Sequence, residues 1–154
     1  MAIEIERKFL VKDDWRPEGQ PICLRQGYLP LSGPMLVRIR QQDDRAFLTL
    51  KGRVDGVTRS EYEYEIPTQD AEELLMRCRK PLIEKMRYLV PVGSYTWEVD
   101  VFSGANSGLV VAEIELSSED EAFDRPDWIV KEVSGDIRYY NSNLAVHPFS
   151  EWER

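Results

Sequence analysis

The 154-residue chain is 42% hydrophobic and 31% charged, with 28 acidic residues, 20 basic residues and a formal net charge of -8. This composition predicts one globular domain over 1–154, and the negative charge argues against a general nucleic-acid binder, which needs a basic surface. The acidic start is unlike a secretory signal and no apolar run approaches a membrane span, so we expect a cytoplasmic protein without membrane or nucleic-acid partners.

Several classes of site are excluded by residue type. His147 is the only histidine, so histidine-based triads and multi-histidine metal sites are impossible. Cys23 and Cys78 lack neighbours at metal-binding spacing. No glycine-rich loop ends in Gly-Lys-Ser/Thr, which excludes a P-loop NTPase.

Short extended segments dominate the predicted structure. In chain order they are expected at 2–11, 22–29, 35–43, 46–52, 57–66, 82–91, 94–102, 109–117 and 128–133. Helices are expected at 68–79, with Thr68 as the N-cap, at 118–124 and at 136–146. Many short strands with few helices favour a β-barrel or a strongly curved sheet.

Charged and apolar side chains alternate along the first segment. Glu4, Glu6 and Lys8 fall on one face, while Ile3 and Ile5 fall on the other. The pattern recurs with like charges two residues apart: the basic pairs are Arg38/Arg40 and Lys85/Arg87, and the acidic sets are Glu61/Glu63/Glu65, Glu98/Asp100 and Glu113/Glu115. Lys51 ends another strand.

Two interpretations fit this alternation. Each strand alone is typical of an antiparallel sheet with one face in water. Repeated like charges repel one another, however, which favours a ligand of opposite sign between them. Acidic pairs suit divalent cations and basic pairs suit phosphate oxygens. The pattern alone leaves a solvated sheet and a metal–polyphosphate site both open.

The order of these residues resembles the CYTH superfamily, the triphosphate tunnel metalloenzymes. The resemblance begins with Glu4-Ile5-Glu6-Arg7-Lys8 and continues through Arg38-Ile39-Arg40 and the later charged pairs to 131–136. It implies a mainly β fold, an eight-stranded antiparallel β-barrel with a charged interior and a few outer helices. The apolar residues would then pack outward beneath the predicted helices.

The resemblance also implies metal-dependent hydrolysis of inorganic triphosphate to pyrophosphate and phosphate, with two Mg²⁺ or Mn²⁺ ions. Glu4, Glu6 and Glu115 would bind the first metal, and Glu61 and Glu113 are candidates for the second. Glu63 or Asp100 would orient the attacking water, and Lys85 is a further catalytic candidate. Expected phosphate-binding residues are Lys8, Arg38, Arg40, Lys51, Lys85, Arg87 and Lys131.

Other functions stay open at this point. Within the superfamily they are a nucleoside triphosphatase, a thiamine triphosphatase and a class IV adenylate cyclase; outside it, a non-catalytic polyphosphate-binding module. A homodimer is also open. Arg25 and Tyr28 have opposite strand parity, so only one of them is expected to face the interior unless Gly27 forms a bulge.

Overall fold

Antiparallel strands form most of the computed structural model, which describes residues 2–153. The strands are β1 (Ile3–Val11), β2 (Ile22–Tyr28), β3 (Leu36–Gln42), β4 (Arg45–Lys51), β5 (Thr58–Ile66), β6 (Ile83–Val92), β7 (Tyr95–Phe102), β8 (Val110–Glu115) and β9 (Ile129–Glu132). Their positions confirm the predicted extended segments to within one or two residues.

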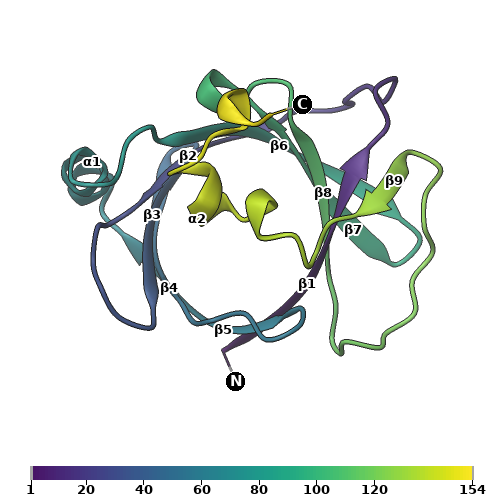
Figure 1. Cartoon of the computed structure of the whole chain (residues 1–154), viewed down its shortest axis with the longest axis horizontal. Helices are drawn as coiled ribbons and strands as arrows, with labels where there is room; N and C mark the ends of the chain where they lie inside the picture. The colour runs from purple at the N-terminus through teal and green to yellow at the C-terminus, as the bar shows by residue number, and fades with distance from the viewer. Residues whose placement is uncertain (1, 154) are drawn as a thin grey trace.

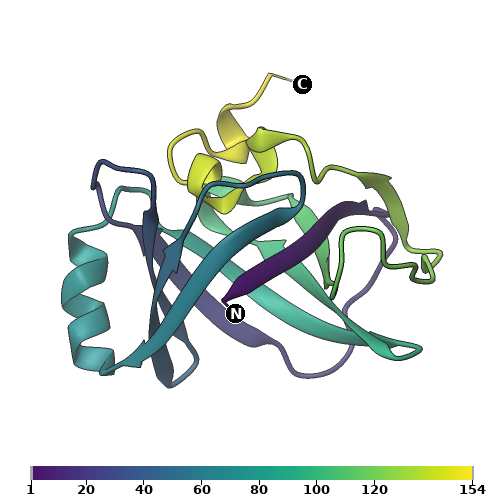
Figure 2. The same ribbon diagram turned by 90° about the horizontal axis from the view of Figure 1, so that it is seen from below.

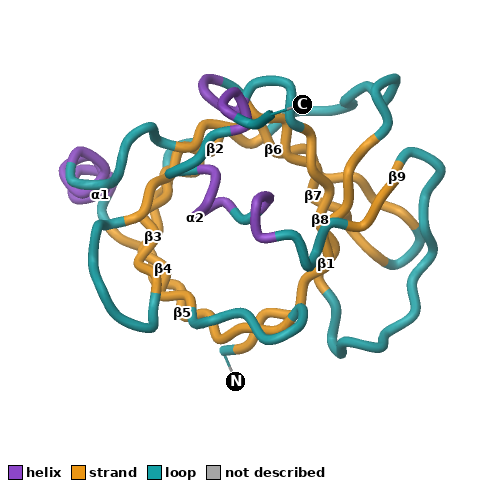
Figure 3. The backbone as a smooth tube through the Cα atoms, viewed as in Figure 1, coloured by secondary structure: helices purple, strands orange, loops and turns teal. Residues whose placement is uncertain are grey.

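The sheet closes into a barrel because β1 pairs with β8 on one of its edges and with β5 on the other. The order is β5-β4-β3-β2-β6-β7-β8-β1, and β1 also pairs with β5 (Figure 1). The short β9 pairs with the far end of β1, outside this closed ring (Figure 3). The predicted eight-stranded antiparallel β-barrel is confirmed, with β9 as an added strand.

The usual distribution of apolar residues is inverted in most of this barrel. Successive side chains point to opposite faces of a strand, so Glu4, Glu6 and Lys8 on β1 face inward together. Outside the barrel, Phe9, Trp97 and their neighbours form a core that is covered by Trp15, Phe123 and Trp128. These covering residues lie in loops, so the expectation that helices provide the outer cover is wrong here.

One helix does cover part of the outside. α1 (Thr68–Met76) lies against the barrel wall beside β3 and β4 (Figure 2). Its residues Ala71 and Leu75 pack on Ile39 and Ala46. It is shorter than the predicted 68–79, because the N–H of Arg77 and Cys78 bond three residues back and tighten the last turn. Its N-cap is Pro67 rather than Thr68.

The predicted helix at 118–124 is absent. A local turn forms instead, in which Glu121 accepts hydrogen bonds from the Ser117 backbone N–H and the Tyr95 hydroxyl, and Ser118 bonds Asp120. Serine and acidic side chains that bond their own neighbourhood compete with helix formation. The prediction of a helix at 118–124 is therefore wrong, because the same serine and acidic side chains form a turn.

The C-terminal segment is broken into short turns and lies across one end of the barrel (Figures 1 and 2). It contains η2 (Ile137–Tyr139), α2 (Asn141–Leu144) and η3 (Phe149–Glu151), in place of one helix over 136–146. Extended backbone at Tyr140 separates the first two. The short η1 (Gly104–Asn106) lies between β7 and β8.

The C-terminal segment is anchored by apolar side chains. The inward rows change from charged to apolar toward one end of the strands, where Ile83, Phe102 and Val111 pack with Leu144 and Ala145. Leu144 and Ala145 have no exposed area. The segment is therefore part of the folded core.

In the described part of the chain, no helix combines the length and apolar character needed to cross a bilayer.

Candidate active site

A polar cavity of about 260 Å³ occupies the barrel interior. Its lining is unusual for a protein interior because it contains equal numbers of acidic and basic side chains. The seven carboxylates belong to Glu4, Glu6, Glu61, Glu63, Glu98, Glu113 and Glu115, and the seven cations to Lys8, Arg38, Arg40, Lys51, Arg59, Lys85 and Arg87. The charged faces predicted from the sequence therefore form the wall of one site.

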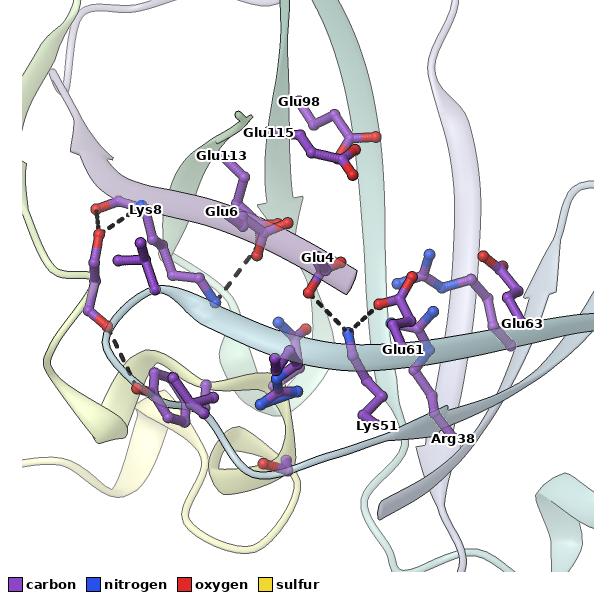
Figure 4. A pocket seen from close by; sticks show the side chains of 18 of the residues that line it. Glu4, Glu6, Lys8, Arg38, Lys51, Glu61, Glu63, Glu98, Glu113 and Glu115 are labelled. Atoms are coloured by element: carbon purple, nitrogen blue, oxygen red, sulfur yellow. Dashed lines mark hydrogen bonds and ion pairs between the residues drawn. The ribbon is translucent and has the colours of Figure 1, made fainter. Parts of the chain in front are cut away.

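Acidic side chains from β1, β7 and β8 gather on one wall, opposite Arg38 and Lys51 (Figure 4). The strand register places Glu98 beside Glu113, and Glu6 beside Glu115. One carboxylate oxygen from each of Glu6, Glu98 and Glu113 lies within 4.8 Å of the other two. This acidic triad is compact enough for all three residues to bind the same cation.

The charges in the triad are strongly coupled. Burial raises the pKa of Glu6 well above its usual value, and the neighbouring Glu113 and Glu4 raise it further. Burial opposes ionisation of Glu113 too, but Lys8, Glu6 and Arg87 together hold its pKa well below the usual range. The Lys8 ammonium lies 3.7 Å from Glu113 Oε1. A proton on Glu6 would relieve the repulsion between its carboxylate and those of Glu113 and Glu4.

A second acidic group surrounds Lys51. Its ammonium lies 3.1 Å from Glu61 Oε2 and 3.7 Å from Glu4 Oε1 (Figure 4). Burial raises the pKa of Glu4 to about 7, although Lys51 acts in the opposite direction. For Glu61 the burial penalty is outweighed by a hydrogen bond with Glu4 and by Lys51, so its pKa is lowered.

The opposite wall presents guanidinium groups that the protein satisfies only in part. Arg38 donates to Thr49 Oγ1 over 3.2 Å, while its buried Nε has no hydrogen-bond partner among the described residues. Arg40 donates from Nε to Gln26 Oε1 over 2.7 Å. Burial, together with Arg38 and Arg87, lowers the pKa of Arg40. An anion in the cavity would supply the missing partner and the missing negative charge.

Asp100 holds two further cations in place. Its Oδ2 lies 2.7 Å from Lys85 Nζ, and its two oxygens accept from Arg87 Nε and Nη2 over 2.8 and 2.9 Å. Burial lowers the pKa of Lys85 to about 8, although Asp100 favours the charged form. Arg87 also contacts Glu98, at 3.2 Å. Arg87 therefore links Asp100 to Glu98 of the acidic triad.

Most of the predicted site residues meet in this cavity, with two exceptions. Asp100 is completely buried behind Lys85 and Arg87 and does not line the cavity, so it is badly placed to orient a water molecule there. Lys131 is exposed on β9 and lies outside the lining, which gives no support to its predicted contact with phosphate. Glu63 and Glu115 line the cavity but are exposed.

The parity question at β2 is resolved without a bulge. Tyr28 is 6% exposed and lines the cavity. Arg25 points outward, where it contacts Gln41 at 3.2 Å and Glu84 at 3.7 Å. Gly27 pairs regularly with Ile39, and a Cβ at this glycine would lie 2.7 Å from Cys78.

Some lining residues were missed by the sequence analysis. Glu98 was predicted as part of an acidic pair but not as a metal ligand. It lies beside Glu113 in the strand register and faces the barrel interior with it. Ser134, Tyr140, Asn141 and Ser142 also line the cavity. They come from a segment without strand periodicity, so no pattern in the sequence indicated where their side chains would lie.

The residues present fit a divalent cation. The acidic triad offers three clustered oxygen ligands, the kind that Mg²⁺ and Mn²⁺ prefer. The lining pairs seven carboxyl groups with seven basic side chains, so its small net charge cannot offset the several negative charges of a bound polyphosphate. Cations bound with the polyphosphate would offset this added charge.

Comparisons with known proteins agree with this geometry. A family model described as the CYTH domain matches residues 2–145. An inorganic triphosphatase of Acetivibrio thermocellus is 47% identical over 155 residues, which cover 99% of each chain. An inorganic triphosphatase of Nitrosomonas europaea is 41% identical over 148 residues, 93% of this chain and 97% of its own.

The similarity extends to a solved structure. The crystal structure of an inorganic triphosphatase superposes with a TM-score of 0.68 at 40% identity, covering 93% of this chain and 97% of that one. Three findings lead to the same assignment. The family model matches most of the chain, two relatives above 40% identity align over nearly their whole length, and the barrel is closed with a charged interior. The chain belongs to the CYTH domain family.

Proposed function

We propose that this protein is a divalent-metal-dependent enzyme that hydrolyses inorganic triphosphate to pyrophosphate and phosphate inside the barrel. One observation carries the proposal: the acidic triad of Glu6, Glu98 and Glu113 lies in the same barrel cavity as clustered lysines and arginines. The two relatives described as inorganic triphosphatases support the choice of substrate.

The basic wall would bind the phosphate oxygens. Arginine side chains can form two parallel hydrogen bonds to a phosphate, and Arg38 has a buried N–H without a partner in the described protein. A pair of unit charges 4 Å apart gains about 1 kcal/mol in water and about 4 kcal/mol at an effective dielectric constant near 20. Enclosure in the barrel therefore strengthens each contact made by Lys8, Lys51, Lys85 and Arg87.

The acidic wall would hold the cations. Glu6, Glu98 and Glu113 are the preferred ligands for the first ion, and Glu115, next to Glu6 in the strand register, is a further candidate. Glu4 and Glu61 are candidates for a second ion. Bound Mg²⁺ or Mn²⁺ supplies charge neutralisation and lowers the pKa of the attacking water. Glu4 and Glu6, whose pKa values burial raises, would lose their protons when they bind a cation.

The chain would contribute orientation and electrostatic stabilisation to the reaction. The oxygen of a water molecule forms a bond to a terminal phosphorus, and the bridging P–O bond breaks with its electron pair going to pyrophosphate. Glu63, which lines the cavity, would accept a proton from that water. Lys85 and Arg87, both held by Asp100, would stabilise the charge on the leaving pyrophosphate.

The alternatives have less support from the cavity. A nucleotide or thiamine triphosphate needs a surface for a base or a thiazolium ring, whereas the lining is dominated by charged side chains. The complete acidic triad also argues against a module that binds polyphosphate without hydrolysing it. A cytoplasmic location and a homodimer stay predictions.

Phosphate release from inorganic triphosphate, ATP and thiamine triphosphate, each with Mg²⁺ or Mn²⁺, tests the proposal. We expect kcat/KM to favour inorganic triphosphate by at least about tenfold, which corresponds to about 1.4 kcal/mol of transition-state stabilisation. Equal or better use of ATP, or formation of cyclic AMP, would instead assign the protein to the nucleotide-dependent alternatives.

A further inference from the structure

Asn141 brings the C-terminal segment into direct contact with the basic wall. It is the first residue of α2, and its side chain lines the cavity. Its Oδ1 accepts a hydrogen bond from Lys85 Nζ over 2.9 Å and a longer one from Gln26 Nε2 over 3.4 Å. A single side chain from outside the barrel strands therefore contacts a buried lysine of the candidate active site.

Lys85 needs such a contact to have a fixed position. A lysine ammonium ends a flexible four-carbon stem and carries three N–H donors, so one ion pair does not fix its orientation. Here Asp100 Oδ2 takes one donor at 2.7 Å and Asn141 Oδ1 takes a second at 2.9 Å. With two donors engaged by the protein, the third is available for a phosphate oxygen.

The same amide extends the network to a second cation. Gln26 is completely buried, and its Oε1 accepts from Arg40 Nε over 2.7 Å while its Nε2 donates to Asn141. The neutral side-chain amides of Asn141 and Gln26 thus link Lys85 to Arg40. Neutral acceptors can orient the two cations without neutralising the positive charge that a phosphate would need.

The backbone of Asn141 is well anchored. Leu144 and Ala145, at the end of the same short helix, are completely buried against Phe102 and Val111. Hydrogen bonds from Leu144 N to Tyr140 O and from Ala145 N to Asn141 O hold the turn together. A side chain on a packed element can hold its partner more accurately than one on an unsupported loop.

We propose that Asn141 is a positioning residue that fixes the Lys85 ammonium for catalysis and couples the C-terminal segment to the basic wall. The inference rests on the proposed triphosphatase function. It assigns a specific task to a residue outside the charged strand pattern: Asn141 acts through Lys85, and its longer contact with Gln26, at 3.4 Å, contributes little.

A double-mutant cycle on kcat/KM for inorganic triphosphate tests this role. Asn141→Ala should lower kcat/KM by about tenfold in the otherwise native protein, as expected for losing a hydrogen bond to a charged group. In a Lys85→Met background, the same substitution should change kcat/KM by less than about twofold, because its target is gone. Single-turnover rates at excess enzyme keep the slower variants measurable.

Asn143→Ala is the matched control. Asn143 lies on the same short helix, but its side chain donates to Ile137 O over 2.6 Å and does not line the cavity. It should change kcat/KM by less than about twofold in both backgrounds. Thermal melting of every variant separates loss of folded protein from loss of rate.

Asn141→Asp gives a second and nearly isosteric measurement. A carboxylate keeps the acceptor for Lys85 but adds negative charge beside the phosphate-binding wall. We therefore expect kcat to stay within about threefold of the native value while KM rises by about tenfold, since like charges repel.

The outcomes separate this inference from the proposed function. An equal loss from Asn141→Ala in both backgrounds would show a general structural role and overturn the inference, as would native kcat/KM in Asn141→Ala. Absence of triphosphate hydrolysis by the native protein would instead overturn the proposed function, before any variant is compared.

Discussion

The Lys85 ammonium lies 2.7 Å from Asp100 Oδ2, and the same carboxylate accepts two hydrogen bonds from Arg87. Asp100 has no exposed area, so one buried group fixes two cations that face the cavity. Burial alone would raise the pKa of Asp100, but Arg87 and Lys85 outweigh it and lower the pKa. The carboxylate therefore holds two basic side chains of the cavity wall in place.

Asp100→Asn should weaken folding and activity together. The substitution leaves two buried cations without their counter-charge, which is expected to lower the free energy of unfolding by about 3 kcal/mol. Misplacement of Lys85 and Arg87 should lower kcat/KM by roughly 10²-fold. Urea denaturation and initial rates measure the two effects. Asp127→Asn is the exposed control, expected to change stability by less than about 0.5 kcal/mol. Native rates in Asp100→Asn would contradict this role.

Glu98→Gln tests the ligand that the sequence analysis did not assign. The substitution keeps the size and removes one of three carboxylate charges in the acidic triad. We expect the Mg²⁺ concentration that gives half-maximal rate to rise at least about tenfold and kcat to fall by roughly 10²-fold. Glu73→Gln, on the outer face of α1, should leave both within about twofold. An unchanged Mg²⁺ requirement in Glu98→Gln would remove Glu98 from the proposed metal site.

Metal removal should stop turnover and lower thermal stability. EDTA is expected to abolish phosphate release, and Mg²⁺ or Mn²⁺ to restore it, because the candidate ligands are all carboxylates. At a metal concentration 100 times Kd, binding adds about 2.7 kcal/mol to the free energy of unfolding. Calorimetric melting should therefore show a higher Tm with metal, and the increase should be much smaller in Glu113→Gln. Full turnover after exhaustive chelation would exclude metal dependence.

The pKa of Glu4 predicts how stability depends on pH in metal-free protein. Its pKa is about 7 in the folded state, against an ordinary value of 4.5, chiefly because of burial. Between these values the folded state holds a proton that the unfolded state has lost, so the contribution of Glu4 to stability falls as pH rises. Below pH 4.5 the carboxyl is protonated in both states, and above pH 7 the full penalty is present.

Comparison with Glu4→Gln isolates this titration. The variant cannot ionise at position 4, so its stability relative to the native protein should increase between about pH 4.5 and pH 7 and then level off. Urea denaturation in EDTA at several pH values measures the difference. A difference that stays constant across this range would show that Glu4 has an ordinary pKa.

Much of the barrel and its charged wall could be predicted from the sequence. A strand period of two places alternate residues on one face, so Glu4, Glu6 and Lys8 had to face the same way. Strand positions followed from the same alternation and from the turns between segments. The resemblance then indicated which face was the interior, which the alternation alone left open.

The remaining errors have different physical causes. Strand parity says which residues share a face but not how far along the barrel each side chain lies. Asp100 has the inward parity of Glu98, yet it lies behind Lys85 and Arg87 and outside the lining. Asn141 could not be predicted as a cavity residue because its position depends on how Leu144 and Ala145 pack at the end of the barrel. The prediction of a helix at 118–124 was wrong because hydrogen bonds formed by nearby side chains stabilise a turn there.

The central claim is hydrolysis of inorganic triphosphate in this cavity, and a ³¹P NMR time course with Mg²⁺ tests it most directly. The native protein should form pyrophosphate and phosphate in equal amounts. Glu113→Gln, within the acidic triad, should lower the rate by roughly 10²-fold, while Glu73→Gln should not change it by more than about twofold. Intact triphosphate after incubation with the native protein, or a native rate in Glu113→Gln, would contradict the account.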